Sequence, residues 1–161
     1  MRDDLVLYHV THKDNVTSIF QEGLLINPPK NNWAGMYLED KLYFAFDAEV
    51  AMDYAMTSDR AEEEGWEEKD FVILIVPFSL LDQDAFLYDW NNLCEYSKEI
   101  NSVAYEKDLP LSILEHVQIV PGEYAGTLKG FELDDYKDSW MYETVMNTFD
   151  EEVESNKERE D

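Results

Sequence analysis

Short apolar segments alternate with polar stretches along most of the chain, and their lengths suit strands better than helices. Leu5–Val10 and Phe71–Pro77 are continuous apolar runs and predict buried strands. The second run is apolar on both faces, which favours a place in the centre of a sheet. Ser102–Tyr105 and His116–Val120 are shorter strand candidates, and Met36–Phe46 has room for one or two more.

Two segments near the N-terminus carry helical patterns instead. The apolar residues within Val16–Phe20 fall on one helical face, Asp14 or Asn15 can cap that helix, and Gly23 suits its C-terminal end. The segment Asp47–Ala55 begins with a good N-cap residue, and its evenly spaced alanines form a slim face that can pack closely on a sheet.

The order of these elements predicts an α+β fold in a single domain, with helices near the N-terminus packed on strands from the middle of the chain. We place this domain at residues 1–149. Residues 150–161 hold seven acidic side chains and no aromatic one, so we expect an acidic, disordered tail.

Charge narrows the classes of partner. The chain has 37 acidic and 12 basic residues, a formal net charge of −25. Such a surface repels nucleic acid and anionic membranes, so we expect direct binding to neither. A basic protein target, or a small molecule in a less acidic site, is the natural partner; the oligomeric state is not predicted.

The remaining composition adds little chemistry. A single cysteine permits no disulfide within the chain, and no segment is apolar enough for a membrane helix, so we expect a cytoplasmic protein. The chain lacks the usual phosphate-loop, zinc and serine-hydrolase motifs. His9 and His12 have no further ligand at a metal-site spacing, so we expect no metal.

One passage of the chain does point to chemistry. A strand ends in Tyr8-His-Val-Thr11, the following helix ends in Glu22-Gly-Leu24, and Tyr43–Ala55 reads Tyr-Phe-x-x-Asp-x-x-x-Ala-x-x-Tyr-Ala. Together these pieces resemble the ADP-ribosyltransferase superfamily of the His-Tyr-Glu type. The resemblance extends, more loosely, to about residue 120. It implies a domain of small split sheets that clasps NAD, with N-terminal helices packed on them.

The resemblance also implies roles for individual residues. His9 would bind a ribose of NAD through its ring nitrogen, and the backbone of Val10 and Thr11 would bind the nicotinamide amide. Either Tyr43 or Tyr37 would stack on the nicotinamide ring, and Tyr43 stands at the better distance from the helix that follows. A flat aromatic face in this place orients the leaving ring.

The third member of the constellation, a glutamate, departs from the family pattern. Its expected position falls at Ser102, which cannot supply a negative charge near the reacting ribose. Strand alternation puts Glu106 on the same face as Ser102, so Glu106 is the candidate catalytic carboxylate.

Two hypotheses about function therefore stay open. The first is an NAD-dependent transferase that passes ADP-ribose to a macromolecular acceptor, most naturally a protein. The second is a divergent, catalytically inactive member of the superfamily. Its acidic surface would imitate DNA and inhibit a basic, nucleic-acid-binding partner, as phage or mobile-element anti-defence proteins do.

Overall fold

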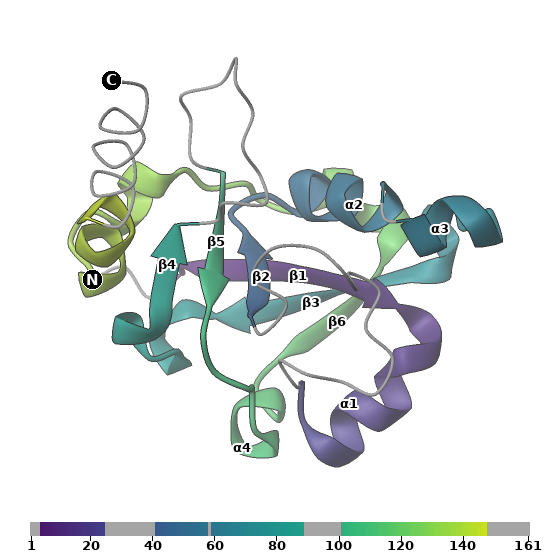
Figure 1. Ribbon diagram of the computed structural model, residues 1–161, viewed down its shortest axis with the longest axis horizontal. Coiled ribbons are helices and arrows are strands. Elements are labelled where there is room, and N and C mark those ends of the chain that lie inside the picture. Colours follow the sequence, from purple (N-terminus) through teal and green to yellow (C-terminus); the bar gives the residue numbers. More distant parts are fainter. Residues whose placement is uncertain (1–3, 25–40, 58, 89–100, 148–161) are drawn as a thin grey trace, which may run out of the picture.

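The computed structural model describes residues 4–24, 41–57, 59–88 and 101–147. Within these ranges six strands form one antiparallel sheet in the order β4-β5-β2-β1-β3-β6 (Figure 1). The strands are β1 (Val6–His12), β2 (Leu42–Ala45), β3 (Phe71–Pro77), β4 (Phe86–Tyr88), β5 (Ser102–Tyr105) and β6 (Gln118–Pro121).

Most strand predictions agree with this sheet. β3 pairs along its length with β1 and also pairs with β6, which confirms its interior place, and β5 has the predicted bounds. β6 begins later than expected because the backbone N–H of His116 still donates to the carbonyl of Ile113, at the end of a helical turn. β4 was not predicted, since three residues at a sheet edge carry no usable periodicity.

The sheet has a narrow connection in its middle. β1 pairs with β3 at every position from Val6 to His12, and β2 pairs with β5 at all four of its residues. Between β1 and β2, the structure pairs only Tyr8 with Ala45. We call this residue pair the joint. It separates a half-sheet β4-β5-β2 from a half-sheet β1-β3-β6, which is the form that the predicted split sheets take here.

Short helices surround the sheet. In Figure 1, α2 and α3 lie along one side and α1 and α4 along the opposite side. The helices are α1 (Val16–Glu22), α2 (Ala48–Met56), α3 (Asp59–Glu64) and α4 (Leu111–Leu114), and residues 140–147 are also helical. Single 3-10 turns are η1 (Lys13–Asn15), η2 (Glu68–Asp70), η3 (Phe78–Leu80), η4 (Gln83–Ala85), η6 (Gly122–Thr127) and η7 (Leu133–Tyr136).

Local residue chemistry explains where the first two α-helices begin and end. Oδ1 of Asp47 accepts the backbone N–H of Glu49 at 2.8 Å and caps α2, as predicted. Gly23 ends α1 with φ +98°, a conformation that favours glycine. Asn15 occupies the N-cap position of α1, as predicted, but its side chain makes no capping hydrogen bond, and a 3-10 turn precedes the helix. The ring of His12 caps that turn, and the Asn15 side chain donates to Thr11 instead.

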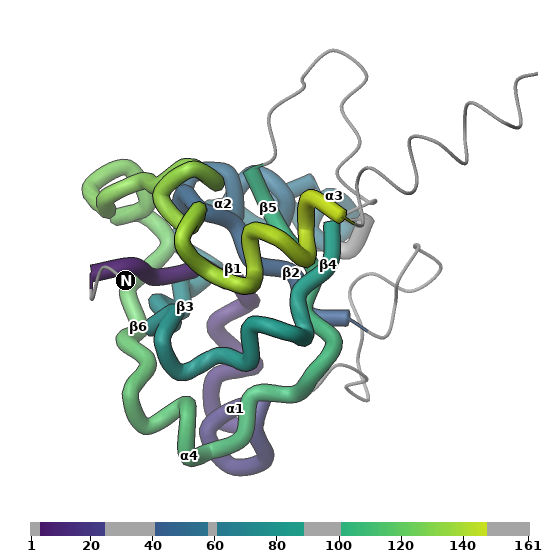
Figure 2. Tube along the Cα trace, turned by 90° about the vertical axis from the view of Figure 1, so that its left-hand side faces the viewer, coloured from purple at the N-terminus to yellow at the C-terminus, as the bar shows by residue number. Residues whose placement is uncertain are grey.

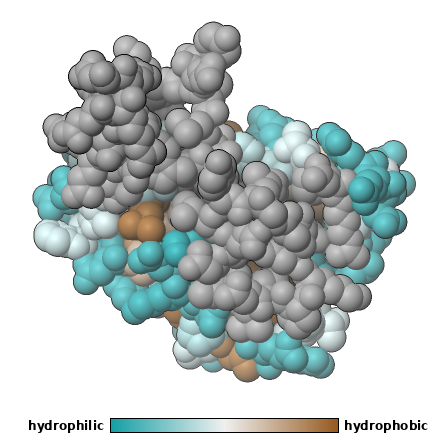
Figure 3. Space-filling model, viewed as in Figure 1, coloured by the Kyte–Doolittle hydropathy of each residue, from teal (hydrophilic) through white to brown (hydrophobic). Residues whose placement is uncertain are grey.

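The core fills both faces of the sheet, and its most fully covered apolar side chains come from every strand but β6. The hydrophobic residues at or below 1% exposure are Leu7, Phe44, Phe46, Ala48, Ile73, Leu74, Val76, Phe78, Phe86, Val103, Ala104, Leu109, Leu114, Tyr136, Met141 and Val145. The described surface in Figure 3 is mostly hydrophilic, with small separate apolar patches. Across the described ranges, no helix has the length and apolar character needed to cross a membrane.

Candidate active site at the joint between the half-sheets

His9 lies one residue beyond the joint, where the backbones of β1 and β2 stop pairing. Its ring Nδ1 is 2.8 Å from the carbonyl oxygen of Tyr43. A carbonyl only accepts hydrogen bonds, so Nδ1 carries the proton and donates it. The ring also meets Phe44 edge-on, with 5.9 Å between the ring centroids. A side-chain N–H of β1 thus bonds to β2 just past the last backbone pair.

This hydrogen bond decides the chemical state of the His9 ring. Burial lowers the pKa of His9 below its ordinary value of 6.5, and the bond to the Tyr43 carbonyl only partly opposes that shift. The neutral imidazole therefore predominates at pH 7. With the proton on Nδ1, Nε2 is a hydrogen-bond acceptor, which suits a ligand hydroxyl group.

Tyr43 contributes its backbone to this contact, and its side chain belongs to the other face of the sheet. Tyr8 and Ala45 are directly opposite each other, so they share one face with Tyr43, two residues before Ala45. His9 and Phe44 share the other face. The structure therefore brings the ring of His9 to the backbone carbonyl of Tyr43, at the edge where the half-sheets meet.

The other residues predicted around His9 lie on the same strand. Thr11 is buried, and its Oγ1 accepts the Asn15 side-chain N–H at 3.0 Å. Val10 pairs with Ile73 of β3 and, in the structure, has no partner residue in β2. After His9, the edge of β1 that faces β2 therefore makes no strand pairing with β2. Tyr37, the second candidate for stacking, lies outside the described residues.

Tyr54 is connected to the strand ends beside the joint, and the sequence analysis gave it no role. It comes from α2, and its hydroxyl donates to the side-chain oxygen of Asn101 at 2.9 Å. The carbonyl of Asn101 accepts the backbone N–H of Phe46 at 3.1 Å, so Asn101 is held from two sides. Ser102 follows it directly. The signal was available in the sequence, since Tyr54 is the last tyrosine of the Tyr43–Ala55 motif.

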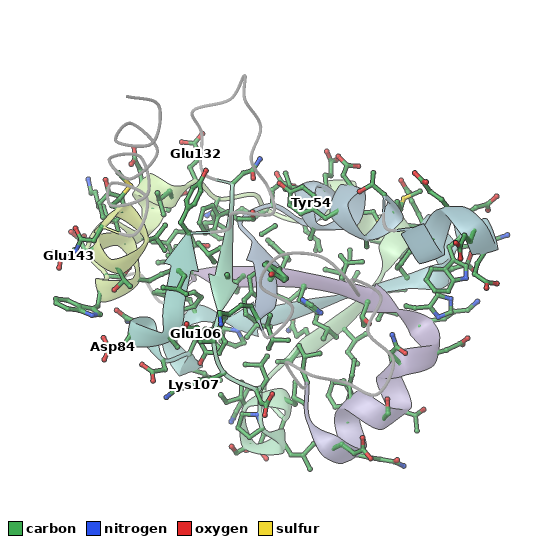
Figure 4. All side chains as sticks on the ribbon, viewed as in Figure 1. Tyr54, Asp84, Glu106, Lys107, Glu132 and Glu143 are labelled. Carbon is green, nitrogen blue, oxygen red and sulfur yellow. The ribbon has the colours of Figure 1, made fainter. Side chains whose placement is uncertain are left out.

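Ser102 and Glu106, the two candidates for the carboxylate position, lie at opposite ends of β5. Ser102 is 2% exposed and pairs with Ala45 of the joint. Glu106 follows the strand, about 13 Å further along at the rise of an extended chain. Figure 4 shows Glu106 and Lys107 near one end of β5 and Tyr54 near the other. Geometry therefore groups Ser102, and not Glu106, with the residues of the joint.

Glu106 has contacts of its own. Its carboxylate oxygen is 3.5 Å from Nζ of Lys41, a largely buried amine, and its backbone N–H donates to the carbonyl of Ala85. The structure does not bring Glu106 to His9, and its catalytic role stays a prediction. No group of three His, Cys, Asp or Glu side chains in the described part of the chain could hold a metal ion.

Comparison with known proteins agrees with this arrangement. The model of the poly(ADP-ribose) polymerase catalytic domain family matches residues 1–107, which include the joint, His9, Tyr43, Tyr54 and Ser102. The chain belongs to this family, and its fold is that of an ADP-ribosyltransferase. The match ends at the close of β5, so α4, β6 and everything after them lie beyond it. No curated protein matches the chain.

Proposed function

We propose that this protein binds NAD at the joint and transfers ADP-ribose to a protein acceptor. The observation that carries the proposal is the hydrogen bond from His9 Nδ1 to the Tyr43 carbonyl, at 2.8 Å. It fixes the ring at the edge between two strands and leaves Nε2 as an acceptor. A ribose hydroxyl can donate the hydrogen bond that Nε2 accepts.

The residues around His9 fit the rest of the ligand. A carboxamide needs one acceptor and one donor side by side, and the edge of an extended strand such as Val10–Thr11 presents backbone groups of both kinds. Stacking of the Tyr43 ring on the nicotinamide stays a prediction from the family pattern, because that ring belongs to the face of the sheet opposite His9. When bound, NAD supplies a ribose–nicotinamide bond whose cleavage makes ADP-ribose available to a nucleophile.

Ser102 sets a limit on the rate that this site can reach. Positive charge develops on the ribose as nicotinamide leaves, and a carboxylate is the strongest stabiliser of such a charge. Ser102 contributes at most a hydroxyl dipole, so we expect slow turnover. A protein is the expected acceptor because the net charge of −25 repels the phosphates of a nucleic acid, and basic proteins are attracted instead.

Calorimetric titration with NAD tests the first half of the proposal. Wild-type protein should bind, and His9→Ala should bind at least tenfold more weakly by loss of an acceptor, while Tyr43→Ala tests the predicted stacking of its ring. His116→Ala is the matched control, since the His116 side chain is 56% exposed and its Nε2 lies 3.3 Å from a carboxylate oxygen of its neighbour Glu115. Binding that is equal in all four proteins, or no binding at millimolar NAD, refutes the site.

Mass spectrometry tests the second half. Wild-type protein incubated with NAD and a basic protein should yield free nicotinamide and an ADP-ribose adduct on the acceptor. Binding of NAD without either product would leave a ligand-binding member of the family that lacks transferase activity. An inactive protein that blocks a basic partner by its charge would instead bind that partner in a strongly salt-dependent way and ignore NAD.

A further inference from the structure

The chain that follows the family match returns to the joint. Residues 129–136, here called the C-terminal clamp, pack beside β1 and the end of β2 through three long-range hydrogen bonds. The Tyr8 hydroxyl donates to the Lys129 carbonyl at 2.5 Å. The backbone N–H of Phe131 donates to the Phe46 carbonyl at 2.9 Å. The Tyr136 hydroxyl donates to the Val6 carbonyl at 2.6 Å.

These bonds reach both strands that meet at the joint, at Tyr8 and on the side of Val6 and Phe46, opposite His9 and Tyr43. Val6 and Tyr8 belong to β1, and Phe46 directly follows Ala45, the joint residue of β2. Figure 2 shows this green-to-yellow part of the chain running along the β1, β2 and β4 region. The clamp therefore connects the half-sheets in addition to the Tyr8–Ala45 pair and the His9 bond to β2.

Tyr136 is the centre of the clamp. It is 1% exposed, and its ring lies 5.0 Å from Phe46, 5.1 Å from Phe78 and 6.2 Å from Phe131, measured between centroids. The ring therefore packs on residues of both half-sheets while its hydroxyl holds β1. Gly130 allows the chain to pass close to α2, because an added Cβ there would lie 2.5 Å from Asp47 Oδ2.

We propose that Tyr136 is a positioning residue of the active site, which acts by holding β1 and β2 at the separation where His9 reaches the Tyr43 carbonyl. The proposal rests on the proposed NAD site for its effect on binding, although its structural part stands without it. A joint of one residue pair leaves the separation of the two strands weakly fixed beyond that pair. The clamp supplies the missing constraint from outside the part of the chain that the family model matches.

The test compares Tyr136→Phe and Tyr8→Phe with Tyr124→Phe, all in the full chain. The first two lose a single clamp hydroxyl and keep their rings, whereas Tyr124 is 51% exposed and accepts a hydrogen bond from Thr127 through its backbone carbonyl, which the substitution keeps. Nitrogen-15 NMR of the histidine rings reports which ring nitrogen carries the proton. We expect His9 to change from one tautomer to a mixture in both clamp variants, with exposed His116 as an internal reference.

NAD titration adds the functional measurement. Loss of one buried hydrogen bond that orients the site should raise the dissociation constant about tenfold in Tyr136→Phe, and by less than about twofold in Tyr124→Phe. A lower melting temperature with unchanged His9 signals and unchanged affinity would reduce the clamp to a stabilising contact. If wild-type protein fails to bind NAD, the proposed function is wrong, and the His9 signals still decide the clamp. Tyr8→Phe keeps this test decisive if Tyr136→Phe does not fold.

Discussion

Replacement of His9 by alanine should affect stability and ligand binding by separable amounts. The variant loses the hydrogen bond to the Tyr43 carbonyl, worth about 1 kcal/mol net, and the edge-on contact with Phe44, worth about 0.5–1.5 kcal/mol. A small cavity adds to the cost, so the free energy of unfolding should fall by about 2–3 kcal/mol. NAD affinity should fall by more than tenfold, since the variant loses the Nε2 acceptor and also the hydrogen bond that connects β1 to β2 beside the ligand.

Urea unfolding and calorimetric titration measure the two effects on the same preparations. His116→Ala should change neither quantity by more than about 0.5 kcal/mol, because surface substitutions away from special features have small effects. The reasoning fails if His9→Ala loses stability and still binds NAD like the wild type. In that case His9 would be a core residue that only closes the gap between β1 and β2.

The remaining predictions concern pH, three glycines and the carboxylate position. Burial lowers the pKa of His9 in the folded state, so as pH falls below about 6.5 the unfolded chain takes up a proton that the folded chain does not. The free energy of unfolding of the wild type, relative to His9→Ala, should therefore decrease below pH 6.5 by up to about 1.4 kcal/mol per unit and level off below the folded pKa, as measured by urea unfolding; a constant difference would contradict a lowered pKa. Gly23→Ala should cost about 2–3 kcal/mol, since φ is +98° and the new Cβ lies 2.8 Å from the Leu109 carbonyl, whereas Gly65→Ala, with φ +68° and nothing within 4 Å, should cost about 1 kcal/mol. Gly122→Ala should cost about 3 kcal/mol although its φ is ordinary, because its Cβ would lie 2.3 Å from the Glu68 carbonyl. Thermal unfolding measures the loss of stability in the three alanine variants, and equal losses in all three would contradict this ranking. Ser102→Glu should raise nicotinamide release at least tenfold while lowering the melting temperature, because it adds a carboxylate at a buried position; a slower release in a folded variant would refute this placement of the charge.

Strong local patterns made much of the fold predictable. The apolar run of β3, the glycine after α1 and the Asp47 cap of α2 each depend on neighbouring residues alone, and the structure confirms all three. β4 and the 3-10 turn η1 were not predicted, because the conformation of three-residue elements is determined by their tertiary neighbours. The split of the sheet followed from the family resemblance, whereas its narrow form, a single Tyr8–Ala45 pair, is a property of strand register.

The candidate site was predictable to a similar extent. His9 and Tyr43 were found from their motif, but the contact between them is ring to backbone, which no motif specifies. Tyr54 was present in the same motif but was given no role, since its partner Asn101 is 47 residues away. The clamp could not have been found from sequence, because Tyr136 and Val6 are 130 residues apart and no spacing rule connects them.

The single pair between β1 and β2 also bears on how the molecule opens. Breaking the ladder between β1 and β3 disrupts seven residue pairs, whereas parting the half-sheets disrupts one backbone pair, the His9 bond, the clamp and the packing of α2 across β1 and β2. Partial unfolding should therefore proceed by separation of two cooperative units rather than by fraying of the whole sheet. A ligand that contacts both units would add its binding free energy to that separation, about 2.7 kcal/mol at a concentration 100 times its dissociation constant. Occupancy would then convert two units that open separately into one.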